Sequence, residues 1–416
     1  MRLARESSRS SLRNGALSHG ARTILLSAGL LALTACAGLA GLEGPDPEAN
    51  GPHGSPIPSD GDSDAPSRPA PSEDCGDVAN DATNCGFCGH SCGGAACSAG
   101  LCAPAVVARA STHVDAFVTD GVGLYTIDAQ AVRSCAASGP ATQACPELVT
   151  GEEIGSRLRM DDVDWGDWGW GGKGKELTSM PAIAPTAIAL QSNRVVIADG
   201  TYEVVVVCPT KVPCTRINVG IVDTDDDAPV LGRSLTLSSS RLFWAQGNAI
   251  RTSPVPVPGL IVHASASRAA SDTVDPARVL AAGADDLFWL SSEGLHSAKD
   301  VSANAERLSA RDARDFAVDD GNAYLASASG LYRVSRADRT ETLAATGTFA
   351  HVVADARGIY ATRIDGGRTT VVDVRSGKVL ELARVDFAVD GLAVAGEYVY
   401  FMTHASGAAE ILRVPR

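Results

Sequence analysis

Short runs of hydrophobic and polar positions alternate from Thr112 to Arg416, and one arrangement of them recurs seven times. Each copy contains an apolar strand, a polar turn, and a doublet of one aliphatic residue followed by an aromatic residue or Val. The doublets are Leu124-Tyr125, Val195-Val196, Leu242-Phe243, Leu287-Phe288, Ala323-Tyr324, Ile359-Tyr360 and Val399-Tyr400. Eight residues before each doublet's second member stands a further apolar residue: Phe117, Ile188, Leu235, Leu280, Phe316, Val352 and Leu392. Self-similarity at a period of roughly 35 to 50 residues is typical of a repeat architecture.

Each copy accommodates four short strands, whereas a helical period is absent from this region. In the fifth copy the strands are expected at Asp315–Asp319, Ala323–Ser327, Gly330–Ser335 and Glu341–Ala345. A third-strand pattern of an aliphatic residue, any residue and Arg recurs at Ala131–Arg133, Ala249–Arg251, Leu331–Arg333 and Ile411–Arg413. The sequence therefore predicts an all-β fold, a seven-bladed β-propeller of four-stranded blades.

The two ends of the repeat region suggest how the propeller closes. The seventh copy stops at Arg416, one strand short, and the apolar run Pro104–Arg109 precedes the first copy. Pairing this run with the last blade would complete that blade and remove an exposed sheet edge. We therefore assign residues 104–416 to the propeller.

Residues 1–35 have the pattern of an export signal, with a basic segment followed by the apolar run Thr23–Ala35. This run is too short to be a permanent membrane-spanning helix. It leads into Leu33-Thr34-Ala35-Cys36, which resembles the lipobox of bacterial lipoproteins. The resemblance implies that Cys36 carries diacylglycerol and a fatty acyl chain such as palmitate, and Ala37 implies sorting to the outer membrane. An ordinary secretory signal is the alternative.

Residues 36–74 are rich in Pro, Gly, Ser and Asp, and this composition predicts a disordered tether behind the lipid anchor. A cysteine-rich module follows at residues 75–103. Its six cysteines are Cys75, Cys85, Cys88, Cys92, Cys97 and Cys102. Because an exported chain meets an oxidising compartment, we expect disulfide bonds here. A zinc site that uses His90 and a redox role for Cys85-Gly-Phe-Cys88 are the alternatives.

Four further cysteines form two local pairs, Cys135 with Cys145 and Cys208 with Cys214. In each pair the first Cys ends one β-run and the second opens the next. We expect structural disulfide bonds across adjacent strands near a hairpin tip.

The net charge of −14 excludes several partners. An acidic surface repels phosphate backbones, so nucleic-acid binding is not expected, and neither is adsorption to anionic lipid. The sequence has no G-x-S-x-G, P-loop, dinucleotide fingerprint or H-E-x-x-H, and we expect neither a cofactor nor a metal.

The repeat also aligns a ring of charges at the start of the innermost strand of each copy. Ten residues before each doublet's second member stand Asp115, Thr186, Arg233, Arg278, Arg314, Ala350 and Asp390, and the next position adds Asp315 and His351. Equivalent positions converge around the axis of a propeller, and several Arg side chains could hold a carboxylate or phosphate. Alternatively, these charges pair between blades and plug the channel.

A long insertion in the first copy, residues 151–181, contains Trp165, Trp168 and Trp170. Exposed Trp side chains on a Gly-rich loop could contact a sugar or a protein, or they could be buried over the propeller face.

Residues 74–416 resemble bacterial, notably myxobacterial, lipoproteins that join a Gly- and Cys-rich module, here Asn84-Cys-Gly-Phe-Cys-Gly-His-Ser-Cys92, to propeller repeats. The resemblance implies a lipid-anchored protein of the cell envelope, in the outer membrane. We expect a non-enzymatic module that binds or scaffolds a protein or glycan. The alternatives are a lactonase-like hydrolase or lyase with a channel-bound metal, and recognition by the Cys-rich module alone.

Overall fold

The computed structural model describes residues 75–416 with gaps, of which the longest are 154–184, 222–233 and 255–266. The chain divides into two units, Met1–Pro66 and Ser67–Arg416, and every described residue belongs to the second. The predicted export signal and tether lie outside the described residues. Within the described residues, no helix has the length and apolar character needed to cross a membrane.

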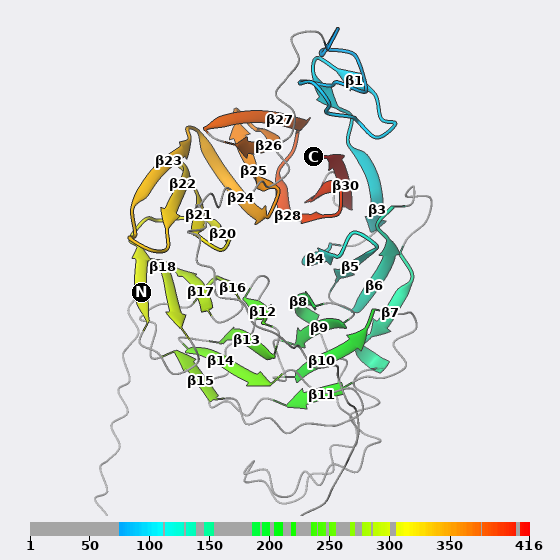
Figure 1. Cartoon of the computed structure of the whole chain (residues 1–416). Coiled ribbons are helices and arrows are strands. Elements are labelled where there is room, and N and C mark those ends of the chain that lie inside the picture. The colour runs from blue at the N-terminus through cyan, green and yellow to red at the C-terminus, as the bar shows by residue number, and fades with distance from the viewer. Residues whose placement is uncertain are drawn as a thin grey trace, which may run out of the picture. The chain divides into compact units, whose positions relative to one another are not determined.

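The described strands pair into seven four-stranded antiparallel sheets and one two-stranded sheet (Figure 1). The first three four-stranded sheets are β4 (Ala116–Thr119), β5 (Gly123–Ile127), β6 (Ala131–Ala136) and β7 (Glu147–Thr150); β8 (Pro185–Gln191), β9 (Arg194–Asp199), β10 (Val204–Pro209) and β11 (Asn218–Ile221); and β12 (Leu235–Leu237), β13 (Arg241–Gln246), β14 (Ala249–Pro254) and β15 (Ser267–Ala270).

The next three sheets keep the same order of four consecutive strands. They are β16 (Val279–Ala282), β17 (Asp286–Ser291), β18 (Gly294–Lys299) and β19 (Glu306–Ser309); β20 (Asp315–Val318), β21 (Asn322–Ser327), β22 (Gly330–Ser335) and β23 (Glu341–Ala345); and β24 (Thr348–Asp355), β25 (Gly358–Asp365), β26 (Arg368–Arg375) and β27 (Lys378–Val385). The four strands predicted in the fifth copy therefore match β20 to β23 to within one residue at each end.

The last sheet joins the two ends of the repeat region. It consists of β28 (Val389–Ala395), β29 (Tyr398–Thr403), β30 (Ala409–Pro415) and, at its outer edge, β3 (Ala105–Ala110). Strand β3 pairs antiparallel with β30, from Ala105 opposite Arg413 to Ala110 opposite Ala409. The predicted pairing of the run before the first copy with the last blade is confirmed.

The first strands of the sheets contact one another in chain order. β4 contacts β8, β8 contacts β12, and the series continues through β16, β20 and β24 to β28, which contacts β4 again. The series can be followed in Figure 1 from the cyan-green β4 to the orange-red β28. An all-β propeller of four-stranded blades is confirmed.

The recurring doublet fills the spaces between these sheets. Neighbouring residues of a strand point to opposite faces, so each doublet sends one side chain toward each adjacent sheet. Tyr125 shares a core cluster with Val195, the first member of the next doublet, and Val196 shares the next cluster with Leu242. The last doublet closes the series, because Tyr400 packs with Leu124 of the first. The apolar residues eight positions earlier are all buried as well.

The cysteine-rich module has little regular structure. Its two-stranded sheet consists of β1 (Cys97–Ser98) and β2 (Leu101–Cys102), and the rest is turns. A disulfide-rich region before the propeller is confirmed.

Candidate functional site

Each described ring position lies at the start of the first strand of its sheet or directly before it. The N–H groups of Asp115, Arg278 and Arg314 bond to the carbonyl groups of Ile127, Leu290 and Ala326, which already pair with the following residue. In β8, β24 and β28 the register shifts around Thr186, Ala350–His351 and Asp390. Bulges re-aim a side chain and are common beside functional sites. Arg233 lies outside the described residues.

Asp315 and His351, two of the predicted ring residues, form contacts that connect the first strands β20, β24 and β28. Asp315 of β20 accepts hydrogen bonds from the N–H groups of Phe316 (2.8 Å) and Val352 of β24 (3.1 Å). His351 of β24 places Nδ1 3.6 Å from the Asp315 carboxylate and Nε2 3.0 Å from the carbonyl oxygen of Val389 in β28. This chain of contacts spans three neighbouring sheets.

The surroundings of Asp315 are those of a structural residue and not of an accessible binding residue. Asp315 is only 1% exposed, and both of its carboxylate oxygens accept backbone hydrogen bonds. A buried carboxylate needs such partners because desolvation penalises its charged form. Asp315 is therefore a structural residue between blades, and His351, which is mostly covered and bridges Asp315 to Val389, belongs to the same connection. At these two positions, the observed contacts agree with the alternative of charges paired between blades.

The acidic ring residues meet two histidines where β28 adjoins β4. His404 Nδ1 lies 2.7 Å from the carboxylate of Asp390, and its Nε2 lies 3.2 Å from the carbonyl oxygen of Val114. The ring of His113 stacks on that of His404 at 4.2 Å, and His113 Nε2 lies 3.7 Å from the carboxylate of Asp115. The side chains of Asp115 and Asp390 remain 40% and 44% exposed. We name this group of four residues the seam cluster.

Arg278 and Arg314 directly precede two adjacent first strands on the side of the series away from the seam cluster. In the series of contacts from β4 to β28, β16 is the fourth of seven strands and β20 is the fifth. Arg278 precedes β16, donates to the carbonyl oxygen of Ser291 at 3.0 Å, and has a side chain that is 50% exposed. Among the described residues, its acidic partner is Asp312, at 3.9 Å. Arg314 precedes β20 and is exposed. These two residues leave guanidinium groups accessible on adjacent blades.

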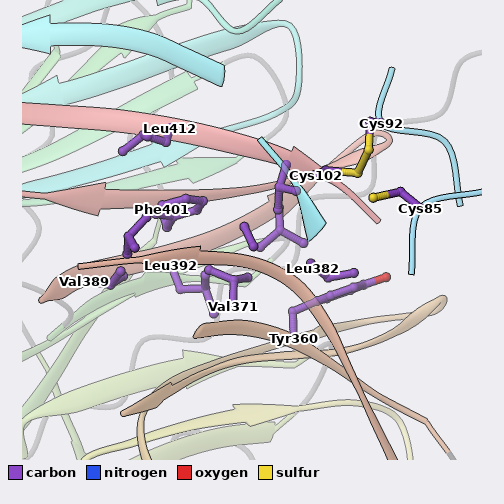
Figure 2. Close-up of a cluster of buried hydrophobic side chains, with 14 residues drawn as sticks. Cys85, Cys92, Cys102, Tyr360, Val371, Leu382, Val389, Leu392, Phe401 and Leu412 are labelled. Atoms are coloured by element: carbon purple, nitrogen blue, oxygen red, sulfur yellow. A yellow bond between two sulfur atoms is a disulfide. The ribbon is translucent and has the colours of Figure 1, made fainter. Parts of the chain in front are cut away.

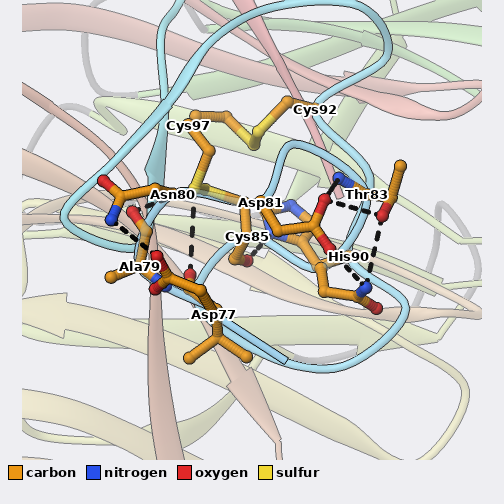
Figure 3. The surroundings of a disulfide bond; sticks show 12 residues. Asp77, Ala79, Asn80, Asp81, Thr83, Cys85, His90, Cys92 and Cys97 are labelled. Atoms are coloured by element: carbon orange, nitrogen blue, oxygen red, sulfur yellow. Dashed lines mark hydrogen bonds between the residues drawn. A yellow bond between two sulfur atoms is a disulfide. The ribbon is translucent and has the colours of Figure 1, made fainter. Parts of the chain in front are cut away.

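The six cysteines of the module form three disulfide bonds: Cys75–Cys88, Cys85–Cys97 and Cys92–Cys102. Figure 3 shows the surroundings of the Cys85–Cys97 bond, where the Asp77 and Asp81 carboxylates accept hydrogen bonds from nearby turns. Among the described residues, the one group of side chains spaced for a metal ion is Cys85, Cys92 and Cys102. Each of these sulfurs is already in a disulfide bond, so none is available as a thiolate ligand.

The module packs against the last two sheets of the propeller. Cys85, Cys92 and Cys102 belong to one core cluster with Tyr360, Leu382, Phe401 and Leu412 (Figure 2). His90 is buried, with Nδ1 2.6 Å from the carbonyl oxygen of Cys85 and Nε2 3.2 Å from that of Pro415 in β30. His90 thus links the module to the propeller, whereas the zinc alternative had made it a ligand.

The hairpin cysteines are also bonded. Cys135, in β6, forms a disulfide with Cys145, two residues before β7. Cys208, in β10, is disulfide-bonded. Its expected partner Cys214 lies outside the described residues, as do Cys36 and the loop residues Trp165, Trp168 and Trp170.

One recurring residue, an Asp five positions before the doublet's second member, was overlooked in the sequence. Asp120, Asp319 and Asp355 each cap the turn between the first and second strands by accepting two backbone N–H bonds. Such Asx turns explain why Asp occupies this position in these three copies. The recurrence itself was visible in the sequence, but the seam cluster was not, because His113 and His404 are 291 positions apart.

Replacing Asp319 by Asn should destabilise the protein near neutral pH, and the difference should shrink as the pH falls through the lowered pKa of Asp319. Burial alone would raise the pKa of Asp319, but hydrogen bonds from the Tyr324 hydroxyl and the Gly321 and Asn322 N–H groups outweigh it and lower the pKa. A carboxyl with a lowered folded-state pKa contributes stability above its unfolded pKa and loses it as the pH falls. Urea midpoints of both proteins from pH 7 to pH 2 would measure this, and a difference that persists unchanged in acid would contradict it.

Comparison with known proteins supports the fold. No protein-family model and no curated protein matches the chain. Among solved structures, the β-propeller domain of Cps50 (Swd1) from Myceliophteria thermophila is similar with a TM-score of 0.50 and 11% identity, over 74% of this chain and 99% of that chain. A chain of the Mitotic Checkpoint Complex is similar with a TM-score of 0.53 and 9% identity, over 76% of this chain and 95% of that chain. At such identities the likeness extends to the propeller fold alone.

Proposed function

We propose that this protein is a seven-bladed, non-enzymatic propeller that binds or scaffolds a protein or glycan at the cell envelope. The exposed guanidinium groups of Arg278 and Arg314 carry this proposal. They stand at equivalent positions, directly before the first strands of adjacent blades, in a chain whose net charge is −14. An accessible guanidinium is suited to bind a carboxylate or phosphate by paired hydrogen bonds.

The seven-bladed ring is part of the proposal. Seven four-stranded sheets and the closed series of contacts from β4 to β28 and back to β4 support it. The seven core clusters support it too, since each holds residues of two neighbouring sheets.

The function can be tested by recovering partners from envelope extracts with immobilised protein. Replacing both Arg278 and Arg314 by Ala should lower the amount of the recovered partner about tenfold, since exposed charged contacts contribute about 1 kcal/mol or less each. Arg357→Ala is the matched control. Its side chain is 54% exposed and paired with Glu397, but it follows the far end of β24 from the ring position. Equal recovery of the partner by the native protein, the double variant and the Arg357→Ala control would refute the proposal.

We further propose that a lipid on Cys36 holds the propeller at the outer membrane, on a tether formed by residues 37–74. The lipobox-like sequence Leu33–Cys36 and the low apolar content of the tether support this. Cys36→Ser should abolish labelling with radioactive palmitate and move the protein from the membrane fraction to the soluble fraction. Unchanged labelling would show that the lipid is attached elsewhere or that the assignment is wrong. Ala37→Ser, next to the proposed site, is the control and should leave labelling intact.

A further inference from the structure

The exposed charged ring residues lie on two sides of the series of first strands, with the carboxylates on one side and the guanidinium groups on the other. The carboxylates of Asp115 and Asp390 lie together where β28 adjoins β4, within the seam cluster. The guanidinium groups of Arg278 and Arg314 lie at β16 and β20, and β16 is three strands away from the seam in either direction. All four side chains are at least partly exposed. The exposed ring residues thus place carboxylates at the junction of β28 with β4 and guanidinium groups at β16 and β20, where the exposed carboxylate of Asp312 lies 3.9 Å from Arg278.

The two sides are held in place by their own neighbours. On the acidic side, His404 binds Asp390, and His113 lies beside Asp115. On the basic side, Arg278 donates to the carbonyl oxygen of Ser291. These contacts orient the charges and still leave about half of each paired side chain accessible. Preorganised charges of this kind select partners and direct their approach more than they raise affinity.

We propose that the partner is a polypeptide segment that carries acidic and basic side chains and lies across the ends of the first strands, its acidic part on Arg278 and Arg314 and its basic part on Asp115 and Asp390. This inference rests on the proposed binding function and chooses a protein over a glycan. A polymer with acidic groups alone, such as a polyuronate, would be repelled by the carboxylates of Asp115 and Asp390 and by the net charge of −14. A polymer with basic groups alone would be attracted to the whole acidic surface and repelled by the two arginines.

Fluorescence anisotropy with three synthetic peptides tests this proposal. One peptide has three Glu at one end and three Lys at the other, joined by a flexible Gly-Ser spacer, and the others carry only Glu or only Lys. The native protein should prefer the mixed peptide. Arg278→Glu with Arg314→Glu should weaken mixed-peptide binding about tenfold and favour the all-Lys peptide, and Asp115→Lys with Asp390→Lys should favour the all-Glu peptide. Reversing all four charges should restore mixed-peptide binding, because the segment can lie the other way round.

This restoration distinguishes lost recognition from a damaged fold. If the Lys substitutions at Asp115 and Asp390 had only destabilised the protein, the added changes at Arg278 and Arg314 would not restore binding. If the Lys variants fail to fold, Asp115→Asn with Asp390→Asn removes the charge and keeps hydrogen-bonding capacity, and it should abolish the preference for the mixed peptide. Equal or tighter binding of the all-Glu peptide or of polygalacturonate by the native protein would overturn the inference and leave the proposed function standing. Failure to bind any peptide, together with arginine-dependent recovery of an envelope partner, would overturn the inference alone. Failure of both the peptide-binding assay and the partner-recovery assay would overturn the inference and the proposed function.

Discussion

Replacing Val107 by Asp is expected to destabilise the propeller by about 4 kcal/mol or more, because it places an unpaired carboxylate inside a core. Val107 lies in β3, the strand that completes the last blade, and it is 4% exposed. It packs in the cluster that also holds Tyr400 and Leu124, so it touches the junction between the first and last blades. Loss of β3 would leave β30 as an open edge, which invites aggregation. Urea unfolding followed by tryptophan fluorescence would measure the effect.

Ala105→Asp is the matched control for this prediction. Ala105 begins the same strand and pairs with Arg413, but its side chain is exposed. The same charge should therefore change the free energy of unfolding by less than about 0.5 kcal/mol. Similar losses in the two variants would mean that the charge itself, rather than the burial of β3, is responsible. A Val107→Asp protein with native stability would show that the closing strand contributes little.

Replacing Asp315 by Ala is expected to cost about 3 kcal/mol of unfolding free energy, because it removes a buried acceptor and leaves donors without one. The N–H group of Val352 in β24 loses its partner in β20, and His351 loses the adjacent carboxylate. The connection between the fifth and sixth copies would weaken. Thermal and urea unfolding would report this loss, and binding of the mixed peptide by the remaining folded protein should be unchanged.

Asp390→Ala gives the opposite pattern and is the control. Asp390 is also a ring aspartate, but its side chain is 44% exposed and bonds mainly to His404. Its loss should cost less than about 1 kcal/mol of stability and should weaken binding of the mixed peptide. If Asp315→Ala impaired binding without loss of stability, the assignment of Asp315 as a structural residue would be wrong.

The core of the fold could be predicted because the doublet encodes it locally. Two adjacent strand residues face opposite sides, so a pair such as Leu242-Phe243 contributes to two cores whatever the rest of the chain does. The closing strand was predictable for a related reason: Ala105–Ala110 is an apolar strand with no partner of its own in the sequence, and β30 is a strand that needs one. Both inferences depend on hydrophobic burial, which is approximately additive along the chain.

The candidate site was only partly predictable. Alignment of the repeats placed Asp115, Arg278, Arg314 and Asp390 at equivalent positions, and the structure shows each of them at the start of the first strand of its sheet or directly before it. The alignment did not distinguish exposed from buried charges, so it grouped the buried Asp315 with the exposed ones. The carboxylate of Asp315 is covered by the neighbouring strand β24, in which the N–H group of Val352 donates a hydrogen bond to it. The partners of a polar group are set by geometry between strands, which a pattern of residue types does not contain.

The sequence by itself determined the repeat, the four-stranded blades, the strand that closes the last one and the presence of disulfide bonds, because periodic burial and cysteine content act locally. Only the tertiary structure decided which of the fifteen possible pairings the six module cysteines adopt, and that His90 and three of these cysteines pack against the last two sheets. It also decided that His113 and His404 meet beside Asp115 and Asp390. These contacts join residues far apart in the chain, and distances between such residues exist only once the blades have packed.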